Sequence, residues 1–201
     1  MYKGYYFITD SALSRHGNVF DVKAAVECEV KIVQYRNKTG NARDMYLEAA
    51  ELKKLCWNTK FIVNDRIDIA LAVEADGIHV GQDDIPYSVA RKLIGKNKIV
   101  GVTVHSIEEA VQAEKSGADY IGVSPVYGTA TKKDAGKPAG TKLIIEIKKV
   151  VKIPLVAIGG INFDNVKDVI SAGADMVCSI SAVITKEDVK SEILEFQKLF
   201  K

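Results

Sequence analysis

Several features that mark particular protein classes are scarce in this sequence. Its 201 residues include three cysteines, far apart and without a CxxC spacing, and three histidines, so neither a zinc cluster nor a disulfide framework is indicated. No apolar run approaches membrane-spanning length, and residues 1–10 lack the basic segment and long apolar stretch of a secretory signal. We therefore expect a cytoplasmic protein with reduced thiols and no membrane partner.

A strong charge imbalance is also absent. The formal net charge is +2 and the basic residues are spread along the chain, so no block of positive charge indicates nucleic acid as a partner. Hydrophobic residues make up 47% of the chain and charged residues 27%, which is the balance of an ordinary globular protein. One core can serve a chain of this length, and we expect a single domain over residues 1–201, with no oligomeric state indicated.

What the sequence does contain is a regular alternation of β-rich runs and stretches with helical periodicity, which predicts a parallel sheet. Eight runs fit the chain at roughly 25 residues per strand and helix unit. We predict an α/β fold, a single-domain TIM (β/α)8 barrel; an open doubly wound sheet is the alternative, but no G-x-G-x-x-G follows the first run. The expected strands are Tyr5–Thr9, Val30–Arg36, Phe61–Asn64, Gly77–Val80, Ile99–Val102, Tyr120–Val123, Leu155–Ile158 and Met176–Ser179, and helical periodicity covers Ala42–Cys56, Ile107–Ser116, Lys142–Val150 and Asn162–Ala172.

An internal echo supports this count of units. The dipeptide Ala-Asp recurs at positions 75–76, 118–119 and 174–175, each time between a helix end and an apolar strand. Gly117 and Gly173 stand directly before two of these dipeptides. Glycine at this place is typical of a helix C-terminal cap.

Polar residues end the expected second strand and begin the loop after it. Reactive side chains of a β/α barrel lie at the C-terminal ends of its strands. The two-residue period of a strand places Gln34, Arg36 and Lys38 on one side, toward the barrel mouth. Three hydrogen-bond donors would then converge on one small volume. The alternative is a strand that frays into a solvated, charged loop.

Two acidic residues, Asp65 and Asp84, follow the next two expected strands. Carboxylates suit Mg²⁺, which usually takes one or two of them together with substrate phosphates and several waters. Taken singly, each aspartate is better explained as the start or cap of the following helix. Taken together, opposite the basic Arg36 and Lys38, they favour a metal site.

Small residues end the last two expected strands, at Gly159-Gly160 and at 179–182. The loops after strands seven and eight of many barrels bind phosphate through backbone N–H groups and a helix N-terminus. The glycine pair permits an anion to approach closely, and this favours a phosphate site over a plain turn.

A long polar segment, 128–140, follows the expected sixth strand. A loop of this length in a compact domain is usually functional or disordered, and its hydroxyl and lysine content suits a lid over phosphates. The alternative is a surface loop that binds nothing. The fifth strand adds Thr103 and His105; a lone histidine there is more often a hydrogen-bonded structural residue than a catalyst.

Five motifs, in this order, resemble those of the thiamine phosphate synthase family, and the resemblance runs from Tyr6 to Ser181. Each motif alone is weak, but five in order are specific. The motifs are Gln34-x-Arg36-x-Lys38, Asn64-Asp65, the run 77–84, Thr129-x-Thr131-Lys132-Lys133-Asp134, and the run 157–161.

The resemblance implies a Mg²⁺-dependent transferase that condenses hydroxymethylpyrimidine diphosphate with hydroxyethylthiazole phosphate, or its carboxylated form, to thiamine phosphate and diphosphate. In the mechanism associated with the family, diphosphate leaves first and the thiazole nitrogen attacks the resulting pyrimidine cation. The residues implied are Arg36, Lys38, Asn64 and Lys132 for the diphosphate, Asp65 and Asp84 for Mg²⁺, Gln34 and His79 for the pyrimidine, and Thr129, Thr131, Gly160, Ile180 and Ser181 for the thiazole phosphate, with Thr103 where the family commonly has serine. Among them, Arg36, Lys132 and Thr103 are expected to act in catalysis.

Two other functions remain open. The sequence also resembles the related thiazole tautomerases at 104–106, where a histidine, here His105, serves as a proton shuttle. Such an enzyme needs no Mg²⁺, and it has little reason to keep Asp65, Asp84 and Lys132. The other alternative is a barrel that only binds a phosphorylated ligand, against which the acidic pair and the loop 128–140 argue.

Overall fold

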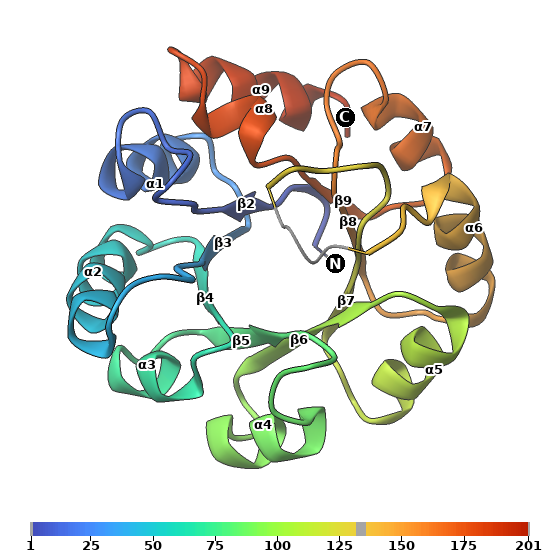
Figure 1. Ribbon diagram of the computed structural model, residues 1–201, viewed down its shortest axis with the longest axis horizontal. Helices are drawn as coiled ribbons and strands as arrows, with labels where there is room; N and C mark the ends of the chain where they lie inside the picture. Colours follow the sequence, from blue (N-terminus) through green and yellow to red (C-terminus); the bar gives the residue numbers. More distant parts are fainter. Residues whose placement is uncertain (1, 132–135, 201) are drawn as a thin grey trace.

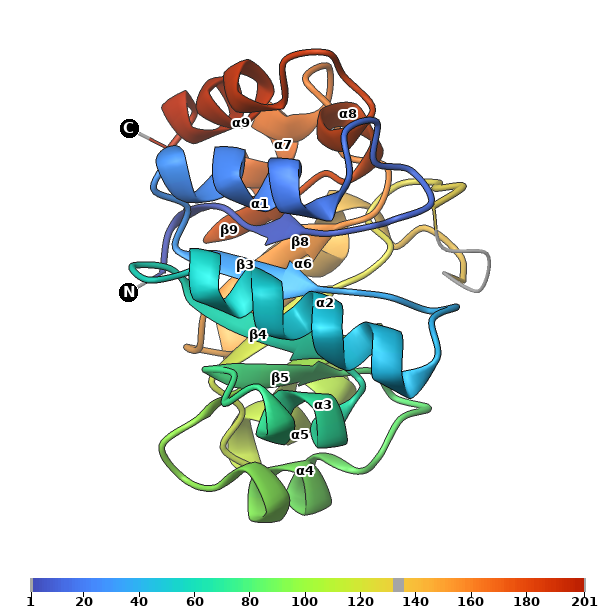
Figure 2. The same ribbon diagram turned by 90° about the vertical axis from the view of Figure 1, so that its left-hand side faces the viewer.

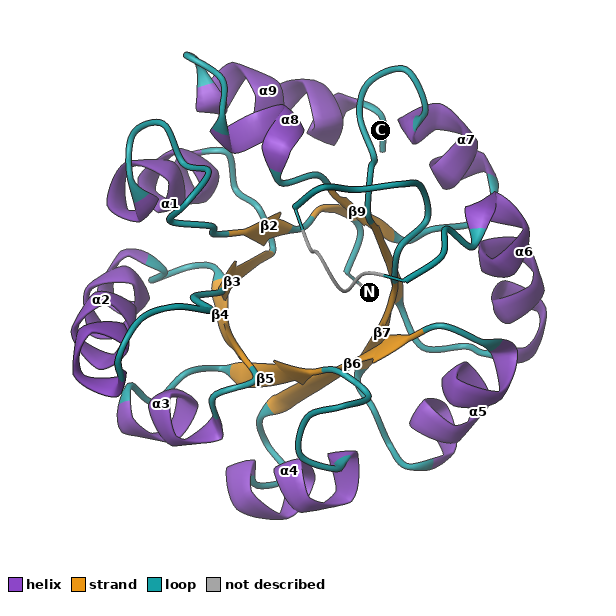
Figure 3. Cartoon of the chain, in the orientation of Figure 1, coloured by secondary structure: helices purple, strands orange, loops and turns teal. Residues whose placement is uncertain are grey.

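The strands of the protein form the inner ring of a barrel and the helices form a ring around them (Figure 1, Figure 3). The structure is a computed structural model that describes residues 2–131 and 136–200. Neighbouring strands are parallel and follow the order β1-β9-β8-β7-β6-β5-β4-β3-β2, which confirms the predicted β/α barrel. The strands are β1 (Gly4–Tyr5), β2 (Phe7–Ile8), β3 (Ile32–Tyr35), β4 (Lys60–Asn64), β5 (Gly77–Val80), β6 (Ile99–Val104), β7 (Tyr120–Val123), β8 (Leu155–Ile158) and β9 (Met176–Cys178), and the helices are α1 (Asn18–Glu27), α2 (Ala42–Leu55), α3 (Ile67–Ala72), α4 (Tyr87–Ile94), α5 (Ile107–Lys115), α6 (Gly140–Val150), α7 (Val166–Ser171), α8 (Ser181–Ile184) and α9 (Val189–Lys198).

The ring closes at the first strand, which is divided in two. β1 pairs with β9, the last strand of the chain, whereas β2 pairs with β3. Between them, the Tyr6 N–H donates to the Val177 carbonyl at 2.8 Å. The prediction of one strand over Tyr5–Thr9 is therefore wrong in its bounds, because the two halves of this segment bond to different neighbours.

Alternate residues of each strand face the barrel interior and the surrounding helices. In β7, Tyr120 and Gly122 line the interior cavity, while Ile121 and Val123 are fully buried on the other side of the strand. The outward face of β7 is therefore apolar, as expected where helices cover a parallel sheet, while its inward face contributes to the cavity. This periodicity decides which strand residues reach the site.

Helix α2 illustrates how the outer ring is built. Asn41 caps its start by accepting a hydrogen bond from the Asp44 N–H at 3.0 Å. Met45, Ala49 and Leu52, at helical spacing, are buried against the sheet. Burial of Leu52 alone contributes about 2 kcal/mol. In the described residues, no helix is long and apolar enough to cross a membrane.

The recurring Ala-Asp dipeptides have a structural role at the N-terminal end of the barrel, opposite the strand ends that carry the polar motifs. Each aspartate precedes one strand, accepts the N–H of a residue at the start of the neighbouring strand, and pairs with a cation on an outer helix. The contacts are Asp76 with Phe61 N (3.0 Å) and Lys53 Nζ (2.5 Å), Asp119 with Val100 N (2.7 Å) and an Arg91 guanidinium nitrogen (2.5 Å), and Asp175 with Leu155 N (2.8 Å) and Lys148 Nζ (2.8 Å).

Helix ends agree with the sequence except after β8. Gly117 and Gly173 follow α5 and α7 with φ of 88° and 105°, as predicted for C-terminal caps. Helix α7, expected from Asn162, begins at Val166 instead. The Asn162 N–H donates to Asn165 Oδ1 at 2.9 Å, and side-chain bonds of this kind compete with the first helical turn.

Candidate functional site

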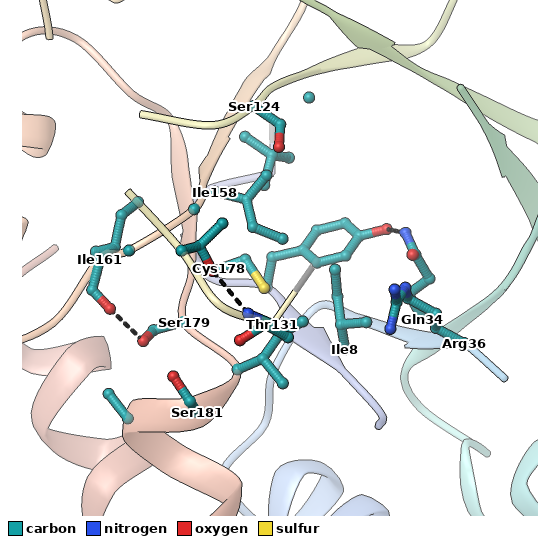
Figure 4. A pocket seen from close by; sticks show the side chains of 18 of the residues that line it. Ile8, Gln34, Arg36, Ser124, Thr131, Ile158, Ile161, Cys178, Ser179 and Ser181 are labelled. Carbon is teal, nitrogen blue, oxygen red and sulfur yellow. Dashed lines mark hydrogen bonds between the residues drawn. The ribbon is translucent and has the colours of Figure 1, made fainter. Parts of the chain in front are cut away.

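A cavity of about 850 Å³ opens at the C-terminal ends of the strands, within the size range of small-molecule sites. Its lining comes from the strand ends and the loops that follow them. Figure 4 shows Gln34 and Arg36 on one side and Ser179 and Ser181 on the other. Of the residues singled out in the sequence, the lining includes Gln34, Arg36, Lys38, Asn64, Asp65, His79, Asp84, Thr103, Thr129, Thr131, Gly160, Ile180 and Ser181, whereas Lys132 lies outside the described residues.

The basic side of the cavity follows β3. Gln34, Arg36 and Lys38 all line it. β3 ends at Tyr35, and Lys38 lies in the following loop with its side chain 49% exposed. The Arg36 guanidinium donates to Asp10 Oδ2 at 2.8 Å, and the two side chains are only 16% and 11% exposed. Asp10 therefore holds Arg36 in place. Sequence reasoning missed Asp10, although the strand-end rule that selected Arg36 also applies after the first strand.

The acidic side joins Asp65 and Asp84. The Lys38 ammonium lies 2.5 Å from Asp65 Oδ2, and Asp84 accepts the Gly81 N–H at 2.7 Å. Neither aspartate caps a helix through its side chain, since α3 and α4 have no side-chain cap bond. The alternative explanation of these residues as helix caps is therefore wrong.

The two carboxyl groups perturb one another. Burial raises the pKa of Asp65 above its ordinary value, its contact with Asp84 raises it further, and Lys38 opposes both. Burial also opposes ionisation of Asp84, but its hydrogen bonds with Asp65 and the Gly81 N–H lower its pKa. Two neighbouring carboxylates repel one another when both are ionised. A cation between them would relieve the repulsion.

Backbone strain accompanies this acidic pair. Asp65 has a φ of 59°, in the left-handed region that side chains other than glycine, asparagine and aspartate rarely adopt. Its N–H donates to the His79 carbonyl at 2.9 Å, which extends the β4–β5 ladder by one residue, and its carbonyl accepts the Ile67 N–H at 3.1 Å. These bonds hold a conformation of the kind that concentrates at functional sites.

The donor set fits Mg²⁺. Asp65 and Asp84 supply two carboxylates, the number that Mg²⁺ commonly takes when substrate phosphates and waters complete its shell. Among the described residues, no group of three or more His, Cys, Asp or Glu side chains gathers as metal ligands. The pair thus suits an ion that arrives with a phosphorylated substrate better than one held by the protein alone.

Small and hydroxyl residues form the side of the cavity opposite β3. A side chain at Gly160 would place its Cβ 2.3 Å from the Gly128 carbonyl, so only glycine lets the β8 loop pass this close to the loop after β7. Thr129 accepts the Thr131 N–H at 3.2 Å. At the start of α8, the first N–H groups have no partner within the helix, as at every helix start. Anion-binding donors are therefore available here.

His105 does not belong to the described lining of the cavity. Its ring lies 3.3 Å from Glu109 Oε2 and is 41% exposed, and its N–H donates to the same carboxylate at 2.6 Å. Ser106 in turn caps α5 by accepting the Glu109 N–H at 3.1 Å. The arrangement resembles a capping box, except that Glu109 accepts the N–H of His105, one residue before the cap, so His105 is hydrogen-bonded at the start of α5.

Two buried tyrosines at the bottom of the cavity were missed in the sequence. Tyr6 and Tyr120 are each 1% exposed and both line the cavity. The signal was available, because Tyr120 alternates with Gly122 and Ser124 along β7 and all three face inward. The period that selected Gln34 and Arg36 would have found them.

Comparison with known proteins yields consistent matches. A sequence profile described as thiamine monophosphate synthase matches residues 5–183. The chain is 53% identical over 193 residues to the thiamine-phosphate synthase of Methanosarcina mazei, covering 96% of this chain and 80% of that protein. It is 49% identical over 199 residues to the thiamine-phosphate synthase of Methanospirillum hungatei, covering 98% and 97%.

Solved structures agree. The thiamine phosphate pyrophosphorylase from Pyrococcus furiosus superposes with a TM-score of 0.89 at 41% identity, covering 98% of this chain and 94% of that one. The 3-hexulose-6-phosphate synthase from Salmonella typhimurium superposes with a TM-score of 0.76 at 18% identity, covering 98% of both chains. The second match shows a shared fold alone.

Proposed function

The chain belongs to the thiamine monophosphate synthase family, and we propose that it is a transferase that condenses hydroxymethylpyrimidine diphosphate with hydroxyethylthiazole phosphate, or its carboxylated form. The products are thiamine phosphate and diphosphate. One observation carries the proposal: the cations Arg36 and Lys38 and the acids Asp65 and Asp84 line one cavity, with small and hydroxyl residues across from them. That distribution suits a diphosphate on one side and a second phosphate on the other.

Arg36, Lys38 and Asn64 bind the diphosphate in this proposal, together with Lys132, which lies outside the described residues. Their task is to stabilise the negative charge that grows on the leaving group as its bond to the pyrimidine breaks. A donor already fixed in position does this without reorganisation, and the Asp10 carboxylate supports that role for Arg36.

Asp65 and Asp84 are the proposed Mg²⁺ ligands. When bound, Mg²⁺ supplies positive charge between the diphosphate oxygens and the two aspartates. Without it, the carboxylates and the diphosphate would repel one another. Contact with Asp84 contributes to the raised pKa of Asp65, and this proximity of two carboxylates supports the assignment.

The other side of the cavity receives the second substrate. Thr129, Thr131, the Gly160 amide and the backbone at 180–181 bind the thiazole phosphate, while Gln34, His79 and Thr103 contact the pyrimidine. No strong protein base is required, because the electron-rich aminopyrimidine stabilises the cation that forms when diphosphate departs. The side chains act by holding the two substrates in line for attack by the thiazole nitrogen.

The tautomerase alternative rests on His105, and two observations weigh against it. The His105 ring contacts Glu109 at the start of α5, and His105 is not among the described cavity residues. A barrel that only binds phosphorylated ligands would have no use for the paired acids Asp65 and Asp84. We therefore favour the synthase.

The test is to incubate the purified protein with both phosphorylated substrates, with and without Mg²⁺, and to measure thiamine phosphate. Asp65→Asn is expected to remove most Mg²⁺-dependent activity, whereas the matched variant Asp83→Asn, an exposed acid outside the described lining, retains it. Lys132→Ala is expected to lower turnover by about 10² or more, the scale of one lost charge contact.

Other outcomes would contradict parts of the proposal. Full activity in the presence of a chelator would remove the metal from the mechanism. An unchanged rate in Lys132→Ala would exclude that lysine from the site. His105→Ala retains condensation in a synthase and loses proton transfer in a tautomerase. Absence of thiamine phosphate in every condition would contradict the synthase and leave the tautomerase and the binding alternatives.

A further inference from the structure

Five side chains, one from between β1 and β2 and four from different strands, form a continuous hydrogen-bonded chain across the barrel interior. The dashed line at the Gln34 amide in Figure 4 is its first bond, in which Nε2 donates to the Tyr6 hydroxyl at 2.8 Å. The Tyr6 and Tyr120 hydroxyls lie 2.7 Å apart, and the Tyr120 hydroxyl lies 2.9 Å from His79 Nδ1. His79 Nε2 lies 2.8 Å from Thr103 Oγ1, and Thr103 lines the cavity.

The direction of this chain follows from its first donor. An amide nitrogen only donates, and each hydroxyl has one proton. Tyr6 accepts from Gln34, and the Tyr120 hydroxyl is the acceptor that the described contacts offer its proton, so we infer that Tyr6 donates to Tyr120. The Tyr120 proton, blocked on that side, is directed to His79 Nδ1.

This direction requires that both tyrosines stay protonated. Burial raises the pKa of Tyr6 and raises that of Tyr120 well above the ordinary value. Over the pH range in which proteins are stable, neither becomes a phenolate that would reverse the order of donors. The order of donors through the two hydroxyls therefore does not change with pH over this range.

Packing holds the rings in place. A side chain at Gly101 would put its Cβ 2.0 Å from the ring carbon that bears the Tyr120 hydroxyl, so glycine reserves the space for this ring. The Tyr120 ring stacks on His79 with centroids 5.5 Å apart and planes at 29°. A phenylalanine at position 120 retains this packing and loses only the hydroxyl.

We propose that Tyr120 is a positioning residue, which holds His79 as the neutral tautomer protonated on Nε2 and thereby leaves the Thr103 hydroxyl proton free for a ring-nitrogen acceptor in the cavity. With its proton on Nε2, His79 donates to Thr103 Oγ1. The hydroxyl proton of Thr103 then points away from the histidine. The identity of the acceptor, a pyrimidine ring nitrogen, rests on the proposed function, whereas the tautomer is a property of the protein alone.

The tautomer can be read from the ¹⁵N chemical shifts of His79 in the ligand-free protein. A His16→Gln/His105→Gln background leaves His79 as the one histidine, because the sequence contains three. We expect a protonated-type shift for Nε2 and an unprotonated-type shift for Nδ1. The reverse pattern would overturn the proposal without any change at the tyrosines.

Three tyrosine variants in the same background separate the effect of the hydroxyl donor to His79 from the effect of ring packing. Tyr120→Phe removes the donor to Nδ1, and the two nitrogen shifts are expected to move toward each other as both tautomers become populated. Tyr6→Phe leaves that donor in place and keeps the Nε2–H pattern. Tyr5→Phe is the matched control, because its equally buried hydroxyl donates to the Ser179 carbonyl at 2.6 Å, outside the chain. An unchanged pattern in Tyr120→Phe would overturn the proposal.

Kinetics connect the tautomer to the reaction. Tyr120→Phe is expected to lower kcat by about tenfold, the equivalent of one well-placed hydrogen bond, and to raise KM for the pyrimidine substrate but not for the thiazole phosphate. Wild-type kinetics in Tyr120→Phe, despite a changed tautomer, would overturn the positioning role. If the tautomer is as expected but the wild type forms no thiamine phosphate, the proposed function fails and the tautomer assignment stands.

Discussion

Asp175→Ala tests whether the three Ala-Asp contacts at the N-terminal end of the barrel, each called a clamp below, stabilise the fold. Asp175 Oδ2 accepts from both Leu155 N and Lys148 Nζ at 2.8 Å, and the Asp175 and Lys148 side chains are 18% and 26% exposed. A charge-assisted hydrogen bond to a sheltered N–H contributes about 1.5–3 kcal/mol. The partly sheltered ion pair adds about 1 kcal/mol. The variant should therefore lose about 2–4 kcal/mol of unfolding free energy.

Urea unfolding followed by far-UV circular dichroism measures this loss, and thermal unfolding should show a fall in Tm of roughly 5–15 °C for a chain of this size. Asp175→Asn keeps an acceptor for the Leu155 N–H and loses the ion pair, so about 1–2 kcal/mol is expected. Thiamine phosphate formation at low temperature should be unchanged, because Asp175 is outside the described cavity lining.

The matched control is Glu195→Ala. Its ion pair with Lys198 lies on the surface, with side chains 53% and 60% exposed, and its loss should cost about 0.5 kcal/mol or less. If Asp175→Ala costs no more than this control, the clamp does not stabilise the barrel. If the asparagine variant is as unstable as the alanine variant, the ion pair rather than the backbone bond carries the effect.

Three further outcomes are expected. Asp10→Ala should lower kcat about tenfold and raise KM for the pyrimidine diphosphate, because Arg36 loses the carboxylate that fixes it; unchanged constants would exclude that role. Burial opposes ionisation of Asp76, but Lys53 and the Phe61 N–H hold its pKa below the ordinary value of 3.8. The carboxylate therefore stabilises the fold above pH 3.8, and this contribution is lost as the pH falls through the folded pKa. In Asp76→Asn, the free energy of unfolding should depend less on pH in this acid range. Burial raises the pKa of Cys28 to about 11 and of Cys56 to about 12, so mass spectrometry should find little alkylation at about pH 8 before unfolding and reaction at all three cysteines after it.

The fold could be predicted because the relevant patterns are local. β5, β7 and β8 have the expected bounds, and the other strands after the first differ from expectation by one or two residues at an end. The strands are mostly apolar and, apart from β1, each is followed by a helix, which leaves few architectures. The division of the first strand could not be predicted, because it depends on β9, which is about 170 residues away along the chain.

The candidate site divides in the same way. Arg36, Asp65 and Asp84 were found because each lies at the end of an expected strand or in the loop that follows it. The hydrogen bonds between side chains of the site could not be predicted, because Tyr6 and Tyr120 are 114 positions apart in the sequence and Asp10 and Arg36 are 26 apart. Local patterns give the direction in which a side chain points, but its partner depends on how the whole ring closes.

The divided first strand has a consequence for synthesis on the ribosome. Residues 4–8 are synthesised about 170 residues before β9, yet Gly4 and Tyr5 pair with that strand. Until residue 178 has emerged from the exit tunnel, the nascent ring keeps an open edge of unpaired N–H and C=O groups. During that interval the open edge is available for pairing with another chain.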